Sequence, residues 1–212
     1  MKITAPMVIR WAGLAAIVGG IIFAGIQPIH PADALESVTT SFWAIIISLK
    51  FAMCFLFLLG ITGIYARQVE ESGWLGLVGF LLFSLSWFLQ TGFVFTELFV
   101  LPVLAPTVPQ FIVSALGVAN GVPGEMSIGA LVPTYNVVGI TYLLGGLLFG
   151  IAIFRARVLP RWPAGLLAVT ALVTPTAAFL PHAQQRFVAV PMGIALAWLG
   201  YSLWSERRTS LD

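Results

Sequence analysis

Six stretches of this sequence are almost wholly apolar, and each reaches or nearly reaches the length of about 20 residues that an α-helix needs to cross a membrane. Only 8% of the 212 residues are charged and 59% are hydrophobic, whereas about 25% are charged in an ordinary soluble domain. The sequence therefore predicts an all-α polytopic membrane protein, with residues 1–212 in one domain that forms a bundle of six transmembrane helices. The helices are expected at about residues 8–29, 42–65, 74–101, 131–154, 163–181 and 187–204.

The basic residues predict an orientation, because lysine and arginine are enriched in cytoplasmic loops. With the N-terminus in the cytoplasm, eight of the 10 lysines and arginines fall on the cytoplasmic side, only Arg186 falls outside, and Lys50 lies in the membrane. Six helices then place both termini in the cytoplasm. The eight residues are Lys2, Arg10, Arg67, Arg155, Arg157, Arg161, Arg207 and Arg208.

The longest loop, at about residues 102–130, lies on the outer side in this topology. Within it, "PQFIVSALGVANG" predicts a short helix, with Pro109 suited to the first turn and Asn120 and Gly121 suited to the end. This segment is too apolar to stand in water, so we expect it at the outer membrane surface or across the end of the bundle.

Internal similarity suggests three related helical hairpins, the third divided between the two ends of the chain. Residues 58–85 resemble residues 147–173, and residues 10–20 resemble residues 161–171. The alternative is that arginine and tryptophan simply mark every cytoplasmic interface. A tryptophan opens each odd-numbered helix, and these are Trp11, Trp74 and Trp162.

Small residues recur at every fourth position of three predicted helices. Such stripes let helices approach closely in lipid, where the hydrophobic effect does not drive helices together. We expect them to pack inside the bundle, with the alternative that one stripe binds a second copy or a partner membrane protein. The stripes are Ala12, Ala16, Gly20 and Ala24; Gly146 and Gly150; and Ala189, Gly193 and Ala197.

A lysine interrupts the second apolar stretch, "TSFWAIIISLKFAMCFLFLLGITGIY". A charge near the middle of a membrane costs about 2.5–3.5 kcal/mol, so Lys50 needs a partner or a cavity. A rise of about 1.5 Å per residue sets Gln90 level with Lys50 and sets the Glu97 backbone roughly 12 Å further outward. Helical side chains lean toward the helix N-terminus, and the two helices run in opposite directions. We therefore expect the Lys50 and Glu97 side chains to converge.

A polar pocket in the outer half of the bundle follows from this geometry. Ser86, Gln90 and Glu97 share one face of the third helix, and Asn136 lies one to two turns into the fourth. We predict that Lys50, Gln90, Glu97 and Asn136 bind a ligand there. Two alternatives stay open: Lys50 extends its amine to the outer interface, or its pairing with Glu97 serves only helix packing.

The two histidines offer a metal site as an alternative. His30 in "IHPAD" and His182 in "LPHAQQR" lie at the outer ends of the first and fifth helices, near the level of Glu97. These side chains are ligands for divalent metals, and Asp33 or Glu36 would add oxygen. No H-x-x-H or H-E-x-x-H spacing supports this site, so we expect no metal.

Motifs of catalysis are absent from the sequence, which contains no P-loop, no G-x-S-x-G and no aspartate cluster. The sequence thus names no catalyst and no cofactor, and it favours a protein that is not an enzyme. The basic residues follow the topology instead of clustering, which argues against nucleic acid as a partner. Cys54 is the single cysteine, so no internal disulfide can form.

Four segments together resemble a group of small six-helix bacterial membrane proteins with no assigned activity. They are the histidine-proline pair after the first helix, "GIYARQ", "GWLGLVGFLLFSL" with the late glutamate of its helix, and "VLPRWPAGLLA". The resemblance spans most of the chain. It implies a six-helix protein of the bacterial inner membrane and implies no activity.

Taken together, these patterns predict a small membrane protein that binds, and by extension transports, a small or lipid-like ligand from an outward-facing pocket. The rival hypothesis is a non-catalytic accessory or structural subunit that docks a partner through its small-residue helix faces. The expected partners are the lipid bilayer, the ligand, and a second copy or another membrane protein.

Overall fold

Six helical segments of the chain are long and apolar enough to cross a membrane. The computed structural model describes residues 2–122, 124–180 and 182–206, apart from the side chains of residues 119, 120, 182 and 183, and these residues contain no strand. The predicted all-α bundle of a multi-pass membrane protein is confirmed. The six spans are Ala5–Ile29, Ser41–Ala66, Val69–Leu104, Leu131–Ala156, Arg161–Phe179 and Arg186–Ser205.

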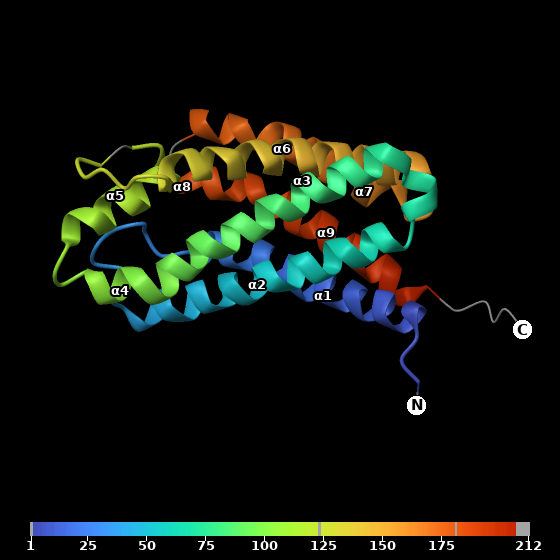
Figure 1. Cartoon of the computed structure of the whole chain (residues 1–212), viewed down its shortest axis with the longest axis horizontal. Coiled ribbons are helices and arrows are strands. Elements are labelled where there is room, and N and C mark those ends of the chain that lie inside the picture. The colour runs from blue at the N-terminus through green and yellow to red at the C-terminus, as the bar shows by residue number, and fades with distance from the viewer. Residues whose placement is uncertain (1, 123, 181, 207–212) are drawn as a thin grey trace, which may run out of the picture.

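The helices agree with the predicted ranges, and the shorter elements lie between and beyond them (Figure 1). The α-helices are α1 (Ala5–Ile26), α2 (Ser41–Ala66), α3 (Val69–Phe95), α4 (Leu101–Leu104), α5 (Pro109–Asn120), α6 (Leu131–Ala156), α7 (Arg161–Val173), α8 (His182–Gln185) and α9 (Val190–Ser205). The 3₁₀ segments are Gln27–Ile29, Thr174–Phe179 and Arg186–Ala189, and a π-helical turn, Thr96–Val100, joins α3 to α4.

Prolines and one glycine set the ends of the regular α-helices. The predicted fifth helix stops being α-helical at Val173, because Pro175 has no N–H to donate and the chain continues as a 3₁₀ segment. Pro191 likewise lies in the first turn of α9, a position that needs no proline N–H. Gly73 has φ 54° inside α3, a backbone angle that glycine adopts without a Cβ clash, so the straight part of α3 begins at Trp74.

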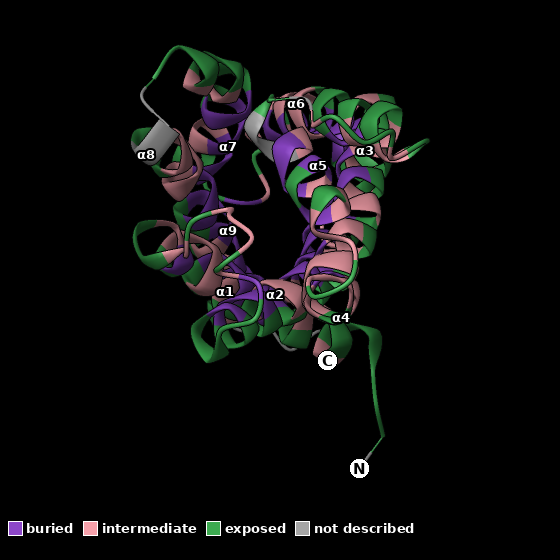
Figure 2. Cartoon of the chain, turned by 90° about the vertical axis from the view of Figure 1, so that its left-hand side faces the viewer, coloured by how far each residue is buried: buried purple, intermediate pink, exposed green. Residues whose placement is uncertain are grey.

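The six spans form a closed ring when the bundle is viewed along its length (Figure 2). The helix α1 packs against α2 and α9, α3 packs against α2 and α6, and α7 packs against α6 and α9. The three predicted hairpins, α2 with α3, α6 with α7 and α9 with α1, are thus neighbouring pairs in the ring. Their descent from a common repeat stays a prediction.

Small residues hold the ring together where helices meet. A Cβ added at Gly20 of α1 would lie 2.7 Å from the Ala197 nitrogen, and one added at Gly193 of α9 would lie 2.7 Å from the Gly20 oxygen. The same close approach joins Gly60 of α2 to Ala16, and Gly150 of α6 to α7. These residues therefore pack inside the bundle, as expected, while the hypothesis of a partner-binding subunit stays a prediction.

The segment α5 has the predicted bounds and lies at the end of the bundle opposite the termini (Figure 1). It begins at Pro109 and ends before Gly121, whose left-handed φ of 66° suits a helix C-terminus. Ile112 and Leu116 are buried in the common core. Of the two expected positions, α5 therefore has the one that caps the bundle.

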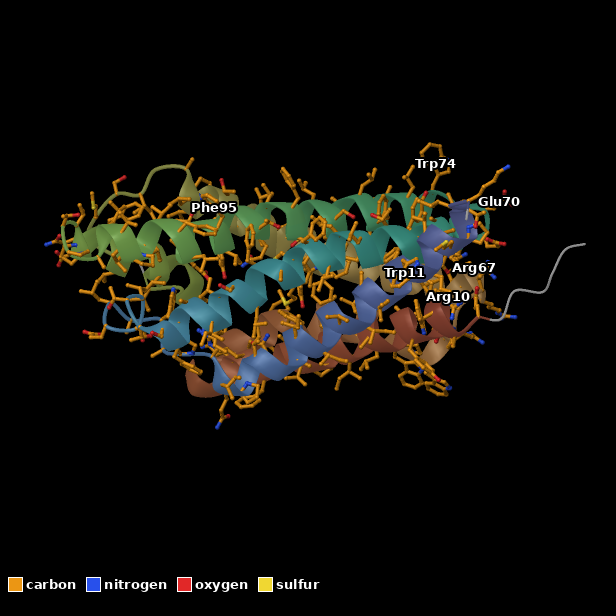
Figure 3. All side chains as sticks on the ribbon, turned by 90° about the horizontal axis from the view of Figure 1, so that it is seen from below. Arg10, Trp11, Arg67, Glu70, Trp74 and Phe95 are labelled. Carbon is orange, nitrogen blue, oxygen red and sulfur yellow. The ribbon has the colours of Figure 1, made fainter. Side chains whose placement is uncertain are left out.

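Basic residues gather at the end that carries both termini, and Arg10, Trp11 and Arg67 all lie at this end (Figure 3). Arg67 forms an ion pair with Glu206 at 2.7 Å, and the Arg10 Nε atom donates to the Trp204 carbonyl oxygen at 3.1 Å. Arg207 and Arg208 lie outside the described residues. This distribution supports the predicted topology, while the identity of the compartment stays a prediction.

Labelling of single cysteines tests the orientation. In a Cys54→Ala background, we expect Val122→Cys to react with a membrane-impermeant maleimide in intact cells, because Val122 is 65% exposed beyond α5. Glu71→Cys, exposed in the first turn of α3, should react only after the membrane is permeabilised. The opposite labelling pattern would show that the protein has the reverse orientation in the membrane.

Candidate functional site: a charge-paired cavity

A partly enclosed cavity of about 300 Å³ lies inside the ring, and every one of the six spans contributes to its wall. Its residues lie toward the end opposite the termini, where α1 ends and α2 and α6 begin. The polar lining consists of Gln27, His30, Asp33, Lys50, Ser86, Gln90, Glu97, Tyr135, Tyr142, Thr174, Gln185 and Arg186. The apolar lining consists of Phe23, Ile26, Met53, Trp87, Val138 and Ala189.

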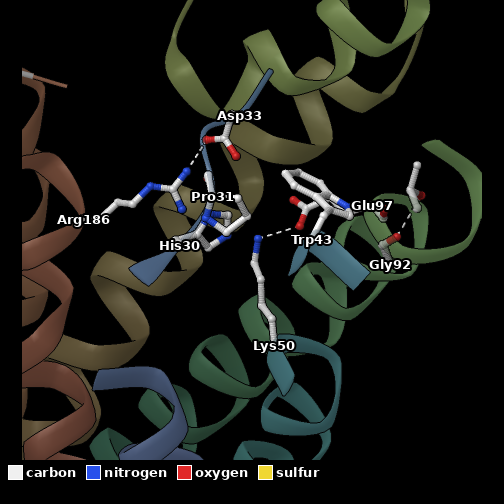
Figure 4. Close-up of polar contacts among 9 residues, drawn as sticks. His30, Pro31, Asp33, Trp43, Lys50, Gly92, Glu97 and Arg186 are labelled. Atoms are coloured by element: carbon white, nitrogen blue, oxygen red, sulfur yellow. Dashed lines mark hydrogen bonds and ion pairs between the residues drawn. The ribbon is translucent and has the colours of Figure 1, made fainter. Parts of the chain in front are cut away.

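The predicted ion pair forms one side of this cavity (Figure 4). The Lys50 Nζ atom donates to Glu97 Oε2 at 2.6 Å, and each of the two side chains is 17% exposed. The convergence expected from the helix directions is thus confirmed, and the Lys50 amine turns into the bundle instead of toward the membrane surface. The indole of Trp43 donates to the backbone oxygen of Glu97 at 3.1 Å, which holds the carboxylate-bearing residue in its π-helical turn.

A second ion pair, which the sequence did not predict, joins the two loops at the cavity rim. An Arg186 Nη2 atom donates to Asp33 Oδ2 and links the segment after α1 to the start of the last span (Figure 4). In the sequence, Arg186 served only as a topology marker and Asp33 only as a spare metal ligand. The available signal was the opposite charge of two loops at equivalent outer positions, "IHPAD" and "LPHAQQR".

His30 lies between the two ion pairs as a neutral side chain (Figure 4). Burial, together with the positive charges of Lys50 and Arg186, lowers the pKa of His30 to about 4. The Nδ1 atom lies 2.8 Å from the Pro31 oxygen, so Nδ1 carries the proton and donates. The Nε2 atom is then an acceptor, and it is buried without a partner in the described part of the chain.

The structure brings three of the four predicted ligand-binding residues together and leaves out the fourth. Lys50, Gln90 and Glu97 all line the cavity, but Asn136 is exposed on α6 and does not. Successive residues of a helix point about 100° apart, so the neighbouring Tyr135 takes the inward position that was predicted for Asn136. The Gln90 amide has no hydrogen-bond partner among the described residues.

The metal alternative receives no geometric support from the described residues. Among them, no group of three His, Cys, Asp or Glu side chains is placed to hold a metal ion. His30 and Glu97 line the same cavity, while the side chain of His182 lies outside the described residues.

Comparisons of the chain with protein-family models, with curated proteins and with solved structures find no match. The resemblance to small six-helix bacterial membrane proteins therefore stays a prediction.

A double-mutant cycle tests the coupling of Lys50 and Glu97. Lys50→Met and Glu97→Gln should each lower the free energy of unfolding by about 2–4 kcal/mol, because each leaves its partner's charge without compensation. The double variant should recover much of this loss. The matched control is the exposed pair of Arg67 and Glu206, whose removal should change stability by less than about 1 kcal/mol. Additive losses at Lys50 and Glu97 in thermal unfolding would contradict the coupling.

The neutral state of His30 predicts a pH dependence of stability. Its pKa is about 4 in the folded protein and 6.5 in the unfolded chain, so its contribution is fully present above pH 6.5 and is lost as the pH falls toward 4. The loss should be on the order of 2–3 kcal/mol in this window. In melting curves at successive pH values, His30→Gln should have a shallower dependence than the parent. Identical slopes would show that His30 does not titrate with unfolding.

Proposed function

We propose that this protein binds a small ligand carrying both cationic and anionic, or strongly donating and accepting, groups in the charge-paired cavity. The observation that carries this proposal is that two ion pairs border open space inside the bundle. A charge in the membrane interior faces a partner, a cavity or a pathway for ligands, and these four charges have both partners and a cavity. A pair that served packing alone would not need the surrounding space.

The balance of charge suggests what such a ligand looks like. The lining contributes two cations, Lys50 and Arg186, and two carboxylates, Glu97 and Asp33. A ligand with charge of one sign would replace only one partner of each ion pair and would leave the charge of the other partner uncompensated. A zwitterion, in contrast, offers a substitute for both partners at once.

Two further features support binding. The free amide of Gln90 supplies donors and an acceptor without breaking an existing hydrogen bond. Apolar side chains, among them Phe23, Met53 and Trp87, line the cavity beside its polar groups. A volume of about 300 Å³ is at the lower end of the range of small-molecule sites, which combine apolar walls with polar groups that orient the ligand.

We further propose that the protein lies in a bacterial inner membrane with cytoplasmic termini, so that the cavity opens to the outside. Transport across the membrane would require Trp87 to move. Its ring lies 4.5 Å from that of Phe57 and also contacts Phe23, Phe83 and Tyr142. These five rings pack together, and three of them, those of Phe23, Trp87 and Tyr142, line the cavity.

Native mass spectrometry of protein released from lipid nanodiscs tests the binding proposal. The parent should retain a bound small molecule, and Gln90→Leu should lose it because the substitution removes the free amide from the cavity wall. The matched control is Asn136→Leu, an amide at a similar depth that lies outside the cavity, and it should retain the molecule. A parent that carries no small molecule, or equal retention in both variants, would overturn the proposal.

A further inference from the structure

The outer surface of α3 carries an apolar groove that faces the lipid beside the cavity. The groove has a volume of about 500 Å³, and its wall is almost entirely apolar. It runs from α2 across α3 to the start of α6. Its main residues are Phe51 of α2, Phe88, Gly92 and Phe93 of α3, and Leu131 and Thr134 of α6.

A gap between α3 and α6 produces this groove. The two helices touch closely at Gly145, where an added Cβ would lie 2.6 Å from the Phe83 Cα atom, and Ser86 donates to the Val138 oxygen one turn further. Toward the end that carries α5 the helices separate (Figure 1). A Cβ added at Gly92, in the wall of the groove, would meet no atom within 4 Å.

The groove and the charged cavity are neighbours across a narrow constriction. A space of about 20 Å³ shares Phe93 and Leu131 with the groove, and it shares Glu97 and Tyr135 with the cavity. This volume holds about one water molecule. The rings of Phe93 and Tyr135, which both line this space, lie edge to face with centroids 5.2 Å apart.

We propose that the groove receives the hydrocarbon chain of a single-chain zwitterionic amphiphile whose headgroup occupies the cavity, and that this ligand enters sideways from the membrane between Phe93 and Tyr135. The proposal rests on the proposed function of the cavity. It identifies the ligand class as an amphiphile and the source as the outer half of the bilayer.

Both halves of such a ligand meet matching surroundings. Lys50 and Arg186 complement the anionic part of a headgroup, while Glu97, Asp33 and the aromatic wall complement a quaternary ammonium. The apolar groove adds no hydrophobic drive over lipid, so it positions the chain and the headgroup site provides selectivity.

The local structure of α3 is suited to a gate at this point. Phe93 and Tyr135 are held by ring contact, and side-chain rotation parts such rings without unfolding a helix. Directly after Phe95 the helix changes to the π-helical turn Thr96–Val100, which carries Glu97. Turns of this kind are frequent at functional sites.

Photocrosslinking tests the lateral entry. The probe is a lysophosphatidylcholine with a diazirine in the middle of its chain, added to protein in vesicles of phosphatidylethanolamine and phosphatidylglycerol. Irradiation should label residues 88–95 of α3, and unlabelled lysophosphatidylcholine should compete with the label. Labelling should fall by about tenfold in Gly92→Leu, which fills the groove, and in Lys50→Met/Glu97→Gln, which removes the inner charges from the headgroup site.

Gly139→Leu is the matched control, because Gly139 is also an exposed helical glycine with open space around it but does not line the groove. It should label like the parent. Phe93→Trp provides a second variant, which enlarges the ring that the groove wall shares with the gate, and it should also reduce labelling.

Three outcomes separate this inference from the function of the cavity. Labelling that is not saturable, or that is unchanged in Gly92→Leu and Phe93→Trp, would come from probe in the bulk lipid and would overturn the lateral entry. If glycerophosphocholine, the headgroup without chains, stabilises the parent and Asn136→Leu but not Gln90→Leu in such a case, the cavity function stands alone. A protein that responds to neither probe refutes a zwitterionic ligand in the cavity as well as the groove.

Discussion

A charged side chain in the hydrocarbon region has to meet an opposite charge or a polar cavity, and Lys50 meets both. Its ammonium is 2.6 Å from the Glu97 carboxylate and borders a space of about 300 Å³. The pair joins α2 to the π-helical turn after α3, and Trp43 of α2 holds the same turn through the Glu97 carbonyl. These two contacts fix the outer end of α3 against α2, and the cavity and the groove lie on either side of that end.

The packing of the ring is consistent with the position of the cavity toward the end opposite the termini. Glycines and alanines bring backbones together at Gly13 with Gly200, at Gly20 with Gly193 and at Gly79 with Phe149. At the level of the cavity, α1 and α9 stay in close contact at Gly20 and Gly193, whereas aromatic rings and ion pairs border the space between the other helices. The close contacts provide packing in the absence of a hydrophobic drive, and the wider spacing elsewhere leaves room for the site.

The net charge of the cavity wall depends on the two ion pairs and on the protonation of His30. His30 stays neutral because it is buried near two cations, and protonation would add a third positive charge to a wall whose four charged groups now balance. The same arrangement favours a ligand that brings both signs of charge. In this low-dielectric surrounding, charge balance thus affects both the stability of the outer end of the bundle and the kind of ligand that the cavity can bind.

Features that depend on the residues of a single helix could be predicted from the sequence alone. Apolar length located the six spans, proline and glycine marked both ends of α5, and the rise per residue with opposite helix directions brought Lys50 to Glu97. Each depends only on residue type and on the fixed geometry of a helix in lipid. The choice of Tyr135 over Asn136, the pair of Asp33 with Arg186 and the position of His30 between the charges required the folded chain. They depend on how far each helix is rotated about its axis and on the path of the loops, and these are set by packing among all six spans, which a single stretch of sequence does not contain.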